Sequence, residues 1–329
     1  MSDERTATNR EFIPPAWLRG TYVQTILASS RVRLLGANPM EDVSQEMILE
    51  VGENIRLQGF FSPQLNRAPK GLAILLHGWE GSAHSTYTLH SGRHFYSQGY
   101  AVFRLNFRDH GGTHHLNEGI FYATLLDEVF EAVKCVSQLP GGFRSFLVGF
   151  SLGGNFSLRI ARKCSHDPIE NLKHIFAISP VINPSRSTDA IDRVWLLREY
   201  FLIKWRRSLR RNQELYPHLY DFTEILSKRT IRSMTDALIH HFGVFQETED
   251  YFRIYTITDD ALKDLNIPTT IITSQDDPAI PVEDFHTLRT NRITNLCIHD
   301  YGGHNGFLNG MAAPTWYEEW ISRSMDNAG

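Results

Sequence analysis

The fold is decided by the stretch Phe146-Leu147-Val148-Gly149-Phe150-Ser151-Leu152-Gly153-Gly154-Asn155. An apolar run leads into Gly149-x-Ser151-x-Gly153, and a segment of helical pattern, 156–163, follows directly. This order predicts a strand, a sharp turn and a helix, with the serine at the tip of the turn. The two glycines remove the Cβ atoms that would clash there. We therefore expect a nucleophilic serine at the end of a strand; a plain Gly/Ser turn is the alternative.

Short apolar runs alternate with segments of helical pattern on both sides of this stretch. Expected strands are 72–76, 100–107, 174–179, 269–274 and 293–299, and expected helices are 87–98, 121–139, 282–290 and 313–325. A hairpin is expected earlier, from strands 47–51 and 55–61. Alternation of this kind predicts βαβ units, a mostly parallel sheet and right-handed crossovers, which is an α/β fold.

The alternation stops between residues 183 and 263. This block has a helical pattern and is rich in aromatic and charged residues. We expect it to be a helical cap that lies over the C-terminal edge of the sheet. The expected organisation is an N-terminal arm at 1–27, a core at 28–182 and 264–329, and the cap at 183–263.

The composition is that of an ordinary globular protein. Of the 329 residues, 42% are hydrophobic and 21% are charged, and the net charge of −4 argues against nucleic-acid binding. No stretch has the roughly eighteen apolar residues of a membrane span, and 1–10 lacks the apolar core of a signal peptide. Three widely spaced cysteines, Cys135, Cys164 and Cys297, predict reduced, buried thiols. We therefore expect a cytoplasmic protein.

Two carboxylates follow a late expected strand. Asp276 and Asp277 lie just past the end of 269–274, where functional residues collect in open α/β sheets. A serine nucleophile needs a histidine to accept its proton, and the histidine needs a carboxylate to orient it. We expect one of the two aspartates to serve this purpose. A turn or a helix N-cap is the alternative for either.

One of the fifteen histidines stands out by its context. His304 lies in Tyr301-Gly302-Gly303-His304-Asn305-Gly306-Phe307, after the last expected strand. Glycines on both sides let this loop bring the imidazole over the serine. We expect His304 to be the base, and His299 at the strand end is the competing candidate.

An oxyanion hole needs two backbone N–H donors aimed at the developing negative charge. We expect one from Leu152, which follows the serine, and the other from Trp79 in the loop after 72–76. Gly78 would let that loop approach closely, and His77 would support it.

Taken together, these pieces resemble the α/β-hydrolase superfamily from about residue 71 to the C-terminus. Within it they are most similar to the YheT-like predicted esterases and the membrane-associated ABHD1/ABHD3-type lipid hydrolases. The resemblance is carried by 15–18 with 24–25, 77–82, 106–108, 149–155, 276–278 and 301–307. It implies a Ser–His–Asp hydrolase of carboxylic esters that uses no metal and no organic cofactor.

The resemblance assigns Ser151, Asp277 and His304 as the catalytic triad. Asp277 is preferred to Asp276 because the residues after it, 278–281, are similar to the Asp-x-x-Val-Pro pattern of many hydrolase acids. Asp276 would then support the loop.

Two segments depart from the family pattern, so the substrate class is not carried over. The loop 109–115 is rich in histidine; metal binding by His110, His114 and His115 is one interpretation, but Gly111-Gly112 argues against the helix that would align them. We expect a polar loop at the pocket rim instead. The stretch 204–211 holds five cations beside apolar 201–203. A solvated helix face is expected, and peripheral contact with an anionic membrane is the alternative.

The expected reaction is hydrolysis of a small-molecule or lipid ester through an acyl-enzyme. The aromatic cap favours an apolar acyl or alcohol group. A membrane-directed lipase or phospholipase, or a thioesterase or acyltransferase with the same triad, are alternatives; a non-enzymatic binding module is disfavoured by the complete triad. The oligomeric state is left open by the sequence.

Overall fold

The computed structural model describes residues 11–243, 245–311 and 313–328. Its centre is an eight-stranded sheet with the strand order β1-β2-β4-β3-β5-β6-β7-β8. The strands are β1 (Gln45–Gly52), β2 (Ile55–Ser62), β3 (Leu72–Leu76), β4 (Ala101–Leu105), β5 (Ser145–Phe150), β6 (Leu172–Ile178), β7 (Thr269–Ser274) and β8 (Thr294–His299). The pairs β1–β2 and β2–β4 are antiparallel, and all other neighbours are parallel. The predicted α/β fold is therefore confirmed.

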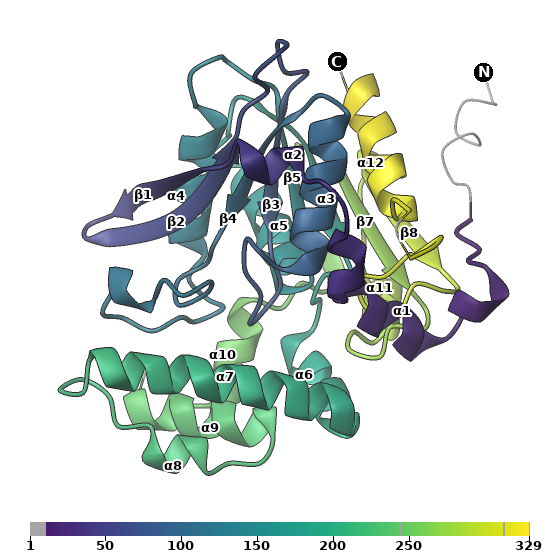
Figure 1. Ribbon diagram of the computed structural model, residues 1–329. Coiled ribbons are helices and arrows are strands. Elements are labelled where there is room, and N and C mark those ends of the chain that lie inside the picture. Colours follow the sequence, from purple (N-terminus) through teal and green to yellow (C-terminus); the bar gives the residue numbers. More distant parts are fainter. Residues whose placement is uncertain (1–10, 244, 312, 329) are drawn as a thin grey trace.

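Helices cover both faces of the sheet because the central strands are apolar on both sides. Strand β3 is fully buried, and its residues divide between two clusters: Leu72, Ile74 and Leu76 pack on one face and Ala73 and Leu75 on the other. The first face is covered by α4 (Leu126–Ser137) and α5 (Leu152–Lys163), the second by α3 (Thr86–Ser97) and α12 (Trp316–Asn327). Figure 1 shows α3 and α12 in front of the sheet.

Among the described residues, five α-helices lie between β6 and β7 in the chain, and we call them the cap helices. They are α6 (Pro184–Arg193), α7 (Trp195–Leu215), α8 (Thr223–Leu226), α9 (Ile231–Phe242) and α10 (Thr248–Ile254). They have a hydrophobic cluster of their own, which includes Leu202, Leu209 and Met234. Figure 1 shows them as a layer beyond one end of the sheet.

The N-terminal arm wraps the core with short elements: η1 (Ala16–Leu18), α1 (Thr21–Ala28), η2 (Arg31–Leu34) and α2 (Pro39–Asp42). Phe12 and Met40 are buried in the cluster formed with α3 and α12. The guanidinium of buried Arg33 lies 3.0 Å from His90 Nδ1, and the same nitrogen lies 2.9 Å from the carboxylate of Glu318. Burial opposes ionisation of Glu318, but the hydrogen bond from His90 and the positive charge of Arg33 prevail and lower its pKa to about 2.

Several expected boundaries are wrong. Helix α4 begins at Leu126 rather than at residue 121, because backbone groups before it bond to side chains: Arg159 donates to the Ala123 carbonyl at 2.7 Å. The helix expected at 282–290 is the four-residue α11 (Glu283–His286), and the strand expected at 100–107 is β4 alone.

Two further findings concern the burial of the cysteines and the length of the helices. Cys135 is exposed, which contradicts the expectation of a buried thiol, whereas Cys164 and Cys297 are buried. Over the residues that the structure describes, we find no helix with the length and apolar character needed to cross a bilayer.

Candidate active site

Ser151 occupies the turn between β5 and α5. Its backbone has φ 54° and ψ −114°, a strained conformation for a residue with a side chain. The neighbouring backbone is so close that a Cβ on Gly149 would lie 2.2 Å from the Gly153 oxygen, and one on Gly153 would lie 2.4 Å from the Leu76 oxygen. Glycine is therefore required at both positions, and the turn holds Ser151 at the carboxyl end of a central strand.

His304 contacts both of its expected partners. It lies on the loop between β8 and α12, with Nε2 3.0 Å from Ser151 Oγ and Nδ1 2.9 Å from Asp277 Oδ2. In this arrangement Nδ1 donates to the carboxylate, which leaves Nε2 free to accept the serine proton. The Asp277 side chain is fully buried, and its Oδ1 also accepts from the backbone N–H groups of Ala279 and Ile280.

Asp276 and His299, the alternative candidates for the acid and the base, make other contacts. Asp276 Oδ1 accepts from the Gly303 N–H at 2.8 Å, and Oδ2 accepts from the Thr21 hydroxyl, so this carboxylate holds the histidine loop. His299 accepts from the Phe12 N–H through Nδ1 and packs against Trp316. Burial lowers the pKa of His299 to about 4, which keeps it neutral.

The two expected oxyanion donors, the N–H groups of Leu152 and Trp79, belong to segments that lie next to Ser151. Leu152 is the first residue of α5, and N–H groups in the first turn of a helix have no acceptor within it. On the other side, a Cβ on Gly78 would be 3.1 Å from Ser151 Cβ, so this backbone lies against the serine. The Gly78 N–H is bound to the Tyr87 hydroxyl at 2.9 Å. The next N–H along the chain is that of Trp79.

His77 supports this loop from below. It is completely buried; Nδ1 donates to the Gly78 carbonyl at 2.7 Å, and Nε2 accepts from the Phe107 N–H. Burial lowers the pKa of His77 well below its usual value, so the ring is neutral and can accept and donate at once.

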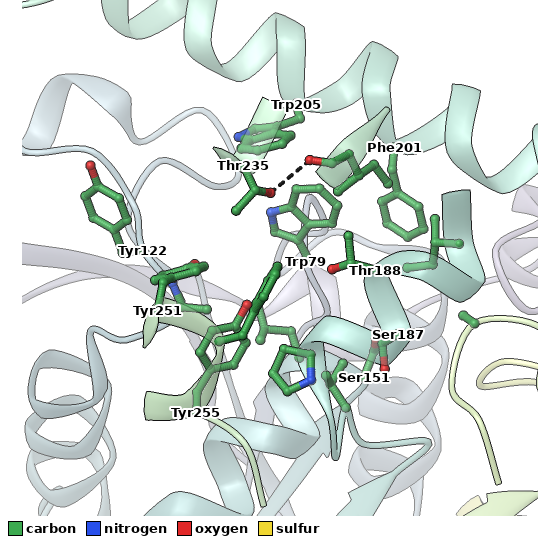
Figure 2. A pocket seen from close by; sticks show the side chains of 18 of the residues that line it. Trp79, Tyr122, Ser151, Ser187, Thr188, Phe201, Trp205, Thr235, Tyr251 and Tyr255 are labelled. Atoms are coloured by element: carbon green, nitrogen blue, oxygen red, sulfur yellow. Dashed lines mark hydrogen bonds between the residues drawn. The ribbon is translucent and has the colours of Figure 1, made fainter. Parts of the chain in front are cut away.

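Ser151 and His304 open into a pocket between the core and the cap helices (Figure 2). The pocket contains about 870 Å³ of space between its lining atoms, part of it open to solvent. Its walls are apolar and aromatic, and among the described residues no Asp, Glu, Lys or Arg lines it. Figure 2 shows Thr235 and Trp205 at the end away from Ser151, with Tyr255 nearer to it.

The histidine-rich loop joins the core to the cap rather than lining the pocket, so the expected rim position is wrong. Asp109 Oδ2 accepts from the Phe121 N–H at 2.8 Å and from the Asn212 amide at 2.9 Å. His114 Nε2 lies 2.8 Å from the Ser208 hydroxyl of α7. Burial lowers the pKa of His114 to about 4 and raises that of Asp109 to about 6. In the described parts of the chain, no three His, Cys, Asp or Glu side chains are grouped to hold a metal ion.

Residues of helix α1 also belong to the site, although the sequence analysis gave them no role. The His304 N–H donates to the Thr25 hydroxyl at 2.9 Å. Buried Gln24 donates to the Leu308 carbonyl and accepts from the Leu308 N–H at 2.8 Å. The signal was a polar pair, Gln24-Thr25, within an otherwise apolar arm. This helix therefore fixes the loop that carries His304.

A protein-family model described as serine aminopeptidase S33 (Hydrolase_4) matches residues 67–303. This match spans well over half of the chain, so the chain belongs to this family of α/β-hydrolases.

Individual relatives are distant. The chain is 22% identical to an abhydrolase domain-containing protein of Dictyostelium discoideum, over 96% of this chain and 82% of that protein. It is also 22% identical to phospholipase ABHD3 of Bos taurus, over 94% of this chain and 76% of the relative. Among solved structures, an esterase of Pyrococcus furiosus superposes with a TM-score of 0.52 at 15% identity, covering 97% of both chains. That likeness concerns the fold.

Proposed function

We propose that this member of the serine aminopeptidase S33 family is a carboxylic ester hydrolase that uses Ser151, His304 and Asp277 as its triad. One observation carries the proposal: an unbroken line of hydrogen bonds runs from a buried carboxylate through His304 to a strained serine at the floor of an apolar pocket. The substrate would be an ester with an apolar acyl or alcohol group.

The first half of the reaction forms an acyl-enzyme. Ser151 Oγ attacks the ester carbonyl while His304 Nε2 takes its proton, and Asp277 stabilises the resulting imidazolium. The N–H groups of Trp79 and Leu152 donate to the oxyanion. His304 then gives the proton to the leaving alkoxide, and the carbon–oxygen bond of the ester breaks.

The second half releases the acid. His304 takes a proton from a water molecule, whose oxygen attacks the acyl carbon. Collapse of the second oxyanion breaks the bond to Ser151 Oγ, which recovers the proton from His304. A thioesterase would differ only in its leaving group, and an acyltransferase in the acceptor that replaces water.

The pocket lining favours an ester over a peptide with a free amino terminus. An α-ammonium group buried without a carboxylate partner carries a large desolvation cost, and none of the described lining residues is acidic. The same lining has no cation for a phosphate, so the apolar part of a substrate would occupy it. A lipid ester stays a candidate because its acyl chain fits this description and ABHD3 is a phospholipase.

The test is a panel of p-nitrophenyl esters from acetate to laurate, together with leucine p-nitroanilide and phosphatidylcholine. Wild-type protein is compared with Ser151→Ala and with Ser97→Ala, an exposed control serine. We expect ester turnover that falls by at least about 10⁴-fold in Ser151→Ala and is unchanged in the control. Undiminished turnover by Ser151→Ala, or a preference for the anilide, would overturn the proposal.

A further inference from the structure

The surface of the N-terminal arm is unusually apolar. Of the large hydrophobic side chains that are exposed within the described chain, seven lie between residues 13 and 35; we call them the arm surface: Ile13, Trp17, Tyr22, Val23, Ile26, Val32 and Leu35. Leu35 is 73% exposed and Trp17 60%. Scattered exposed apolar residues are normal, but a gathering of this kind on one short segment marks an interaction site.

Helix α1 shows this exposure most clearly, because apolar side chains cover its outer side and polar side chains its inner side. A helix on a globular protein usually buries its apolar side chains. The buried residues of α1 are Gln24 and the small Ala28, and Thr25 binds the backbone of His304. Tyr22, Val23 and Ile26 face outward. The inner side of α1 is therefore committed to the histidine loop, and its outer side has no partner within the described chain.

The charge of the arm indicates what that partner is. From residue 12 to residue 40 the chain contains no Asp or Glu, whereas Arg19 and Arg31 are exposed. Trp and Tyr are the side chains that prefer the boundary between lipid headgroups and acyl chains, and exposed arginines attract anionic headgroups. A surface that binds a protein more often carries charges of both signs.

We propose that the arm surface docks on an anionic lipid bilayer. The apolar side chains would enter the interfacial layer while Arg19 and Arg31 contact the headgroups. Docking there would bring the His304 loop, on the other side of α1, toward the bilayer. The proposal concerns binding, so it does not depend on the reaction assigned to Ser151.

A second surface must be distinguished from the arm surface. Helix α7 exposes Trp195, Tyr200 and Ile203 ahead of the basic stretch 204–211. The cations of that stretch are partly engaged: Lys204 donates to the Glu80 carbonyl at 2.8 Å, Arg206 to the Lys228 carbonyl, and Arg211 pairs with Glu214. Arg207 and Arg210 of that stretch are exposed, but α7 exposes fewer large apolar side chains than the arm surface does, so we expect it to contribute less to membrane binding.

The experiment is cosedimentation with phosphatidylcholine vesicles with and without phosphatidylglycerol. All proteins carry Ser151→Ala so that vesicle lipids are not consumed. The arm variant is Trp17→Ser/Tyr22→Ser/Ile26→Ser, and the matched control is Trp195→Ser/Tyr200→Ser/Ile203→Ser on α7. We expect the parent to bind anionic vesicles in a salt-sensitive manner, the arm variant to bind at least about tenfold more weakly, and the control to bind as the parent does.

Folding is checked by thermal melting and by hydrolysis of p-nitrophenyl butyrate in the same variants with Ser151 restored; both should match wild type. Equal vesicle binding by the parent and the arm variant would overturn the proposal, as would a loss confined to the α7 control. The proposal would also be overturned if the parent did not bind vesicles and sedimentation velocity showed a dimer that the arm variant abolishes. The arm surface would then be occupied by a second copy of the chain.

Discussion

Two regions meet at the pocket, and they are built on different principles. The core supplies Ser151, Asp277 and His304 from loops that directly follow β5, β7 and β8. The cap helices supply the opposite wall, including Phe201, Thr235 and Tyr251. In the core the backbone determines where each side chain lies, as the clash distances around Gly149 show. In the cap the positions follow from packing between helices that are far apart in sequence.

We therefore expect the core to carry the reaction and the cap to select the substrate. The proposed nucleophile, base and acid each depend on a few neighbouring residues and on a parallel sheet that brings strand ends together. The volume and length of the pocket depend on how α6, α7, α9 and α10 rest on the core. We therefore expect substitutions in the core loops to reduce the rate for every ester, and substitutions in the cap to change which ester is preferred.

The largest effect is expected at Asp277, and the neighbouring Asp276 is its comparison. Asp277→Asn should lower kcat by about 10³- to 10⁴-fold, because the amide favours the wrong tautomer of His304. Asp276→Asn should cost only about tenfold, because that carboxylate acts on the loop backbone. The measurement is steady-state hydrolysis of p-nitrophenyl butyrate by both variants. Equal losses in the two would contradict the separation of roles.

An intermediate effect is expected where core and cap are joined. Burial raises the pKa of Asp109 to about 6, above its value near 4 in an unfolded chain. A raised acid pKa favours the protonated folded form, so this contribution to stability is complete below about pH 4 and is lost as the pH rises through 6. Asp109→Asn removes that loss and keeps an oxygen that can accept from Asn212.

Urea unfolding at pH 4.5 and at pH 7.5 tests this expectation. The free energy of unfolding of Asp109→Asn minus that of wild type should be larger at pH 7.5 than at pH 4.5 by about 2 kcal/mol. A difference that does not change with pH would show that Asp109 does not titrate in this range.

The smallest effect is expected from the cap. Thr235 lies at the end of the pocket away from Ser151 (Figure 2), so Thr235→Phe should fill the space that a long chain would occupy. The ratio of kcat/KM for decanoate to that for butyrate should fall about tenfold, whereas Thr235→Ser should leave it unchanged. If kcat/KM fell equally for both esters at an unchanged melting temperature, the far end of the pocket would not select chain length.

The same contrast explains what could be predicted from the sequence. The runs 72–76 and 269–274 match β3 and β7 residue for residue. Strand β3 is a continuous apolar run, as expected for a strand buried on both faces, and β7 is rich in the β-branched residues Thr and Ile, which favour strands. The end of β5 at Phe150 was predicted because the glycine spacing around Ser151 requires a turn. These signals are local, and so they can be seen in one short window of sequence.

Signals that depend on distant residues were missed. The start of α4 was placed five residues early because the hydrogen bonds that 121–125 form with Arg159 and Tyr251 cannot be seen in that segment. The role of Thr25 was missed because its partner, His304, lies 279 positions away. The histidine-rich loop was placed at the rim because its bonds to α7 depend on where the cap rests.

The central claim is that Ser151 is the nucleophile, activated by His304. Its most direct test is labelling with a fluorophosphonate, followed by mass spectrometry of the digested protein. We predict one phosphonate per chain, on the peptide that contains Ser151, and no labelling of the Ser151→Ala or His304→Ala variants on the same time scale. Labelling at another serine, or undiminished labelling of Ser151→Ala, would contradict the account.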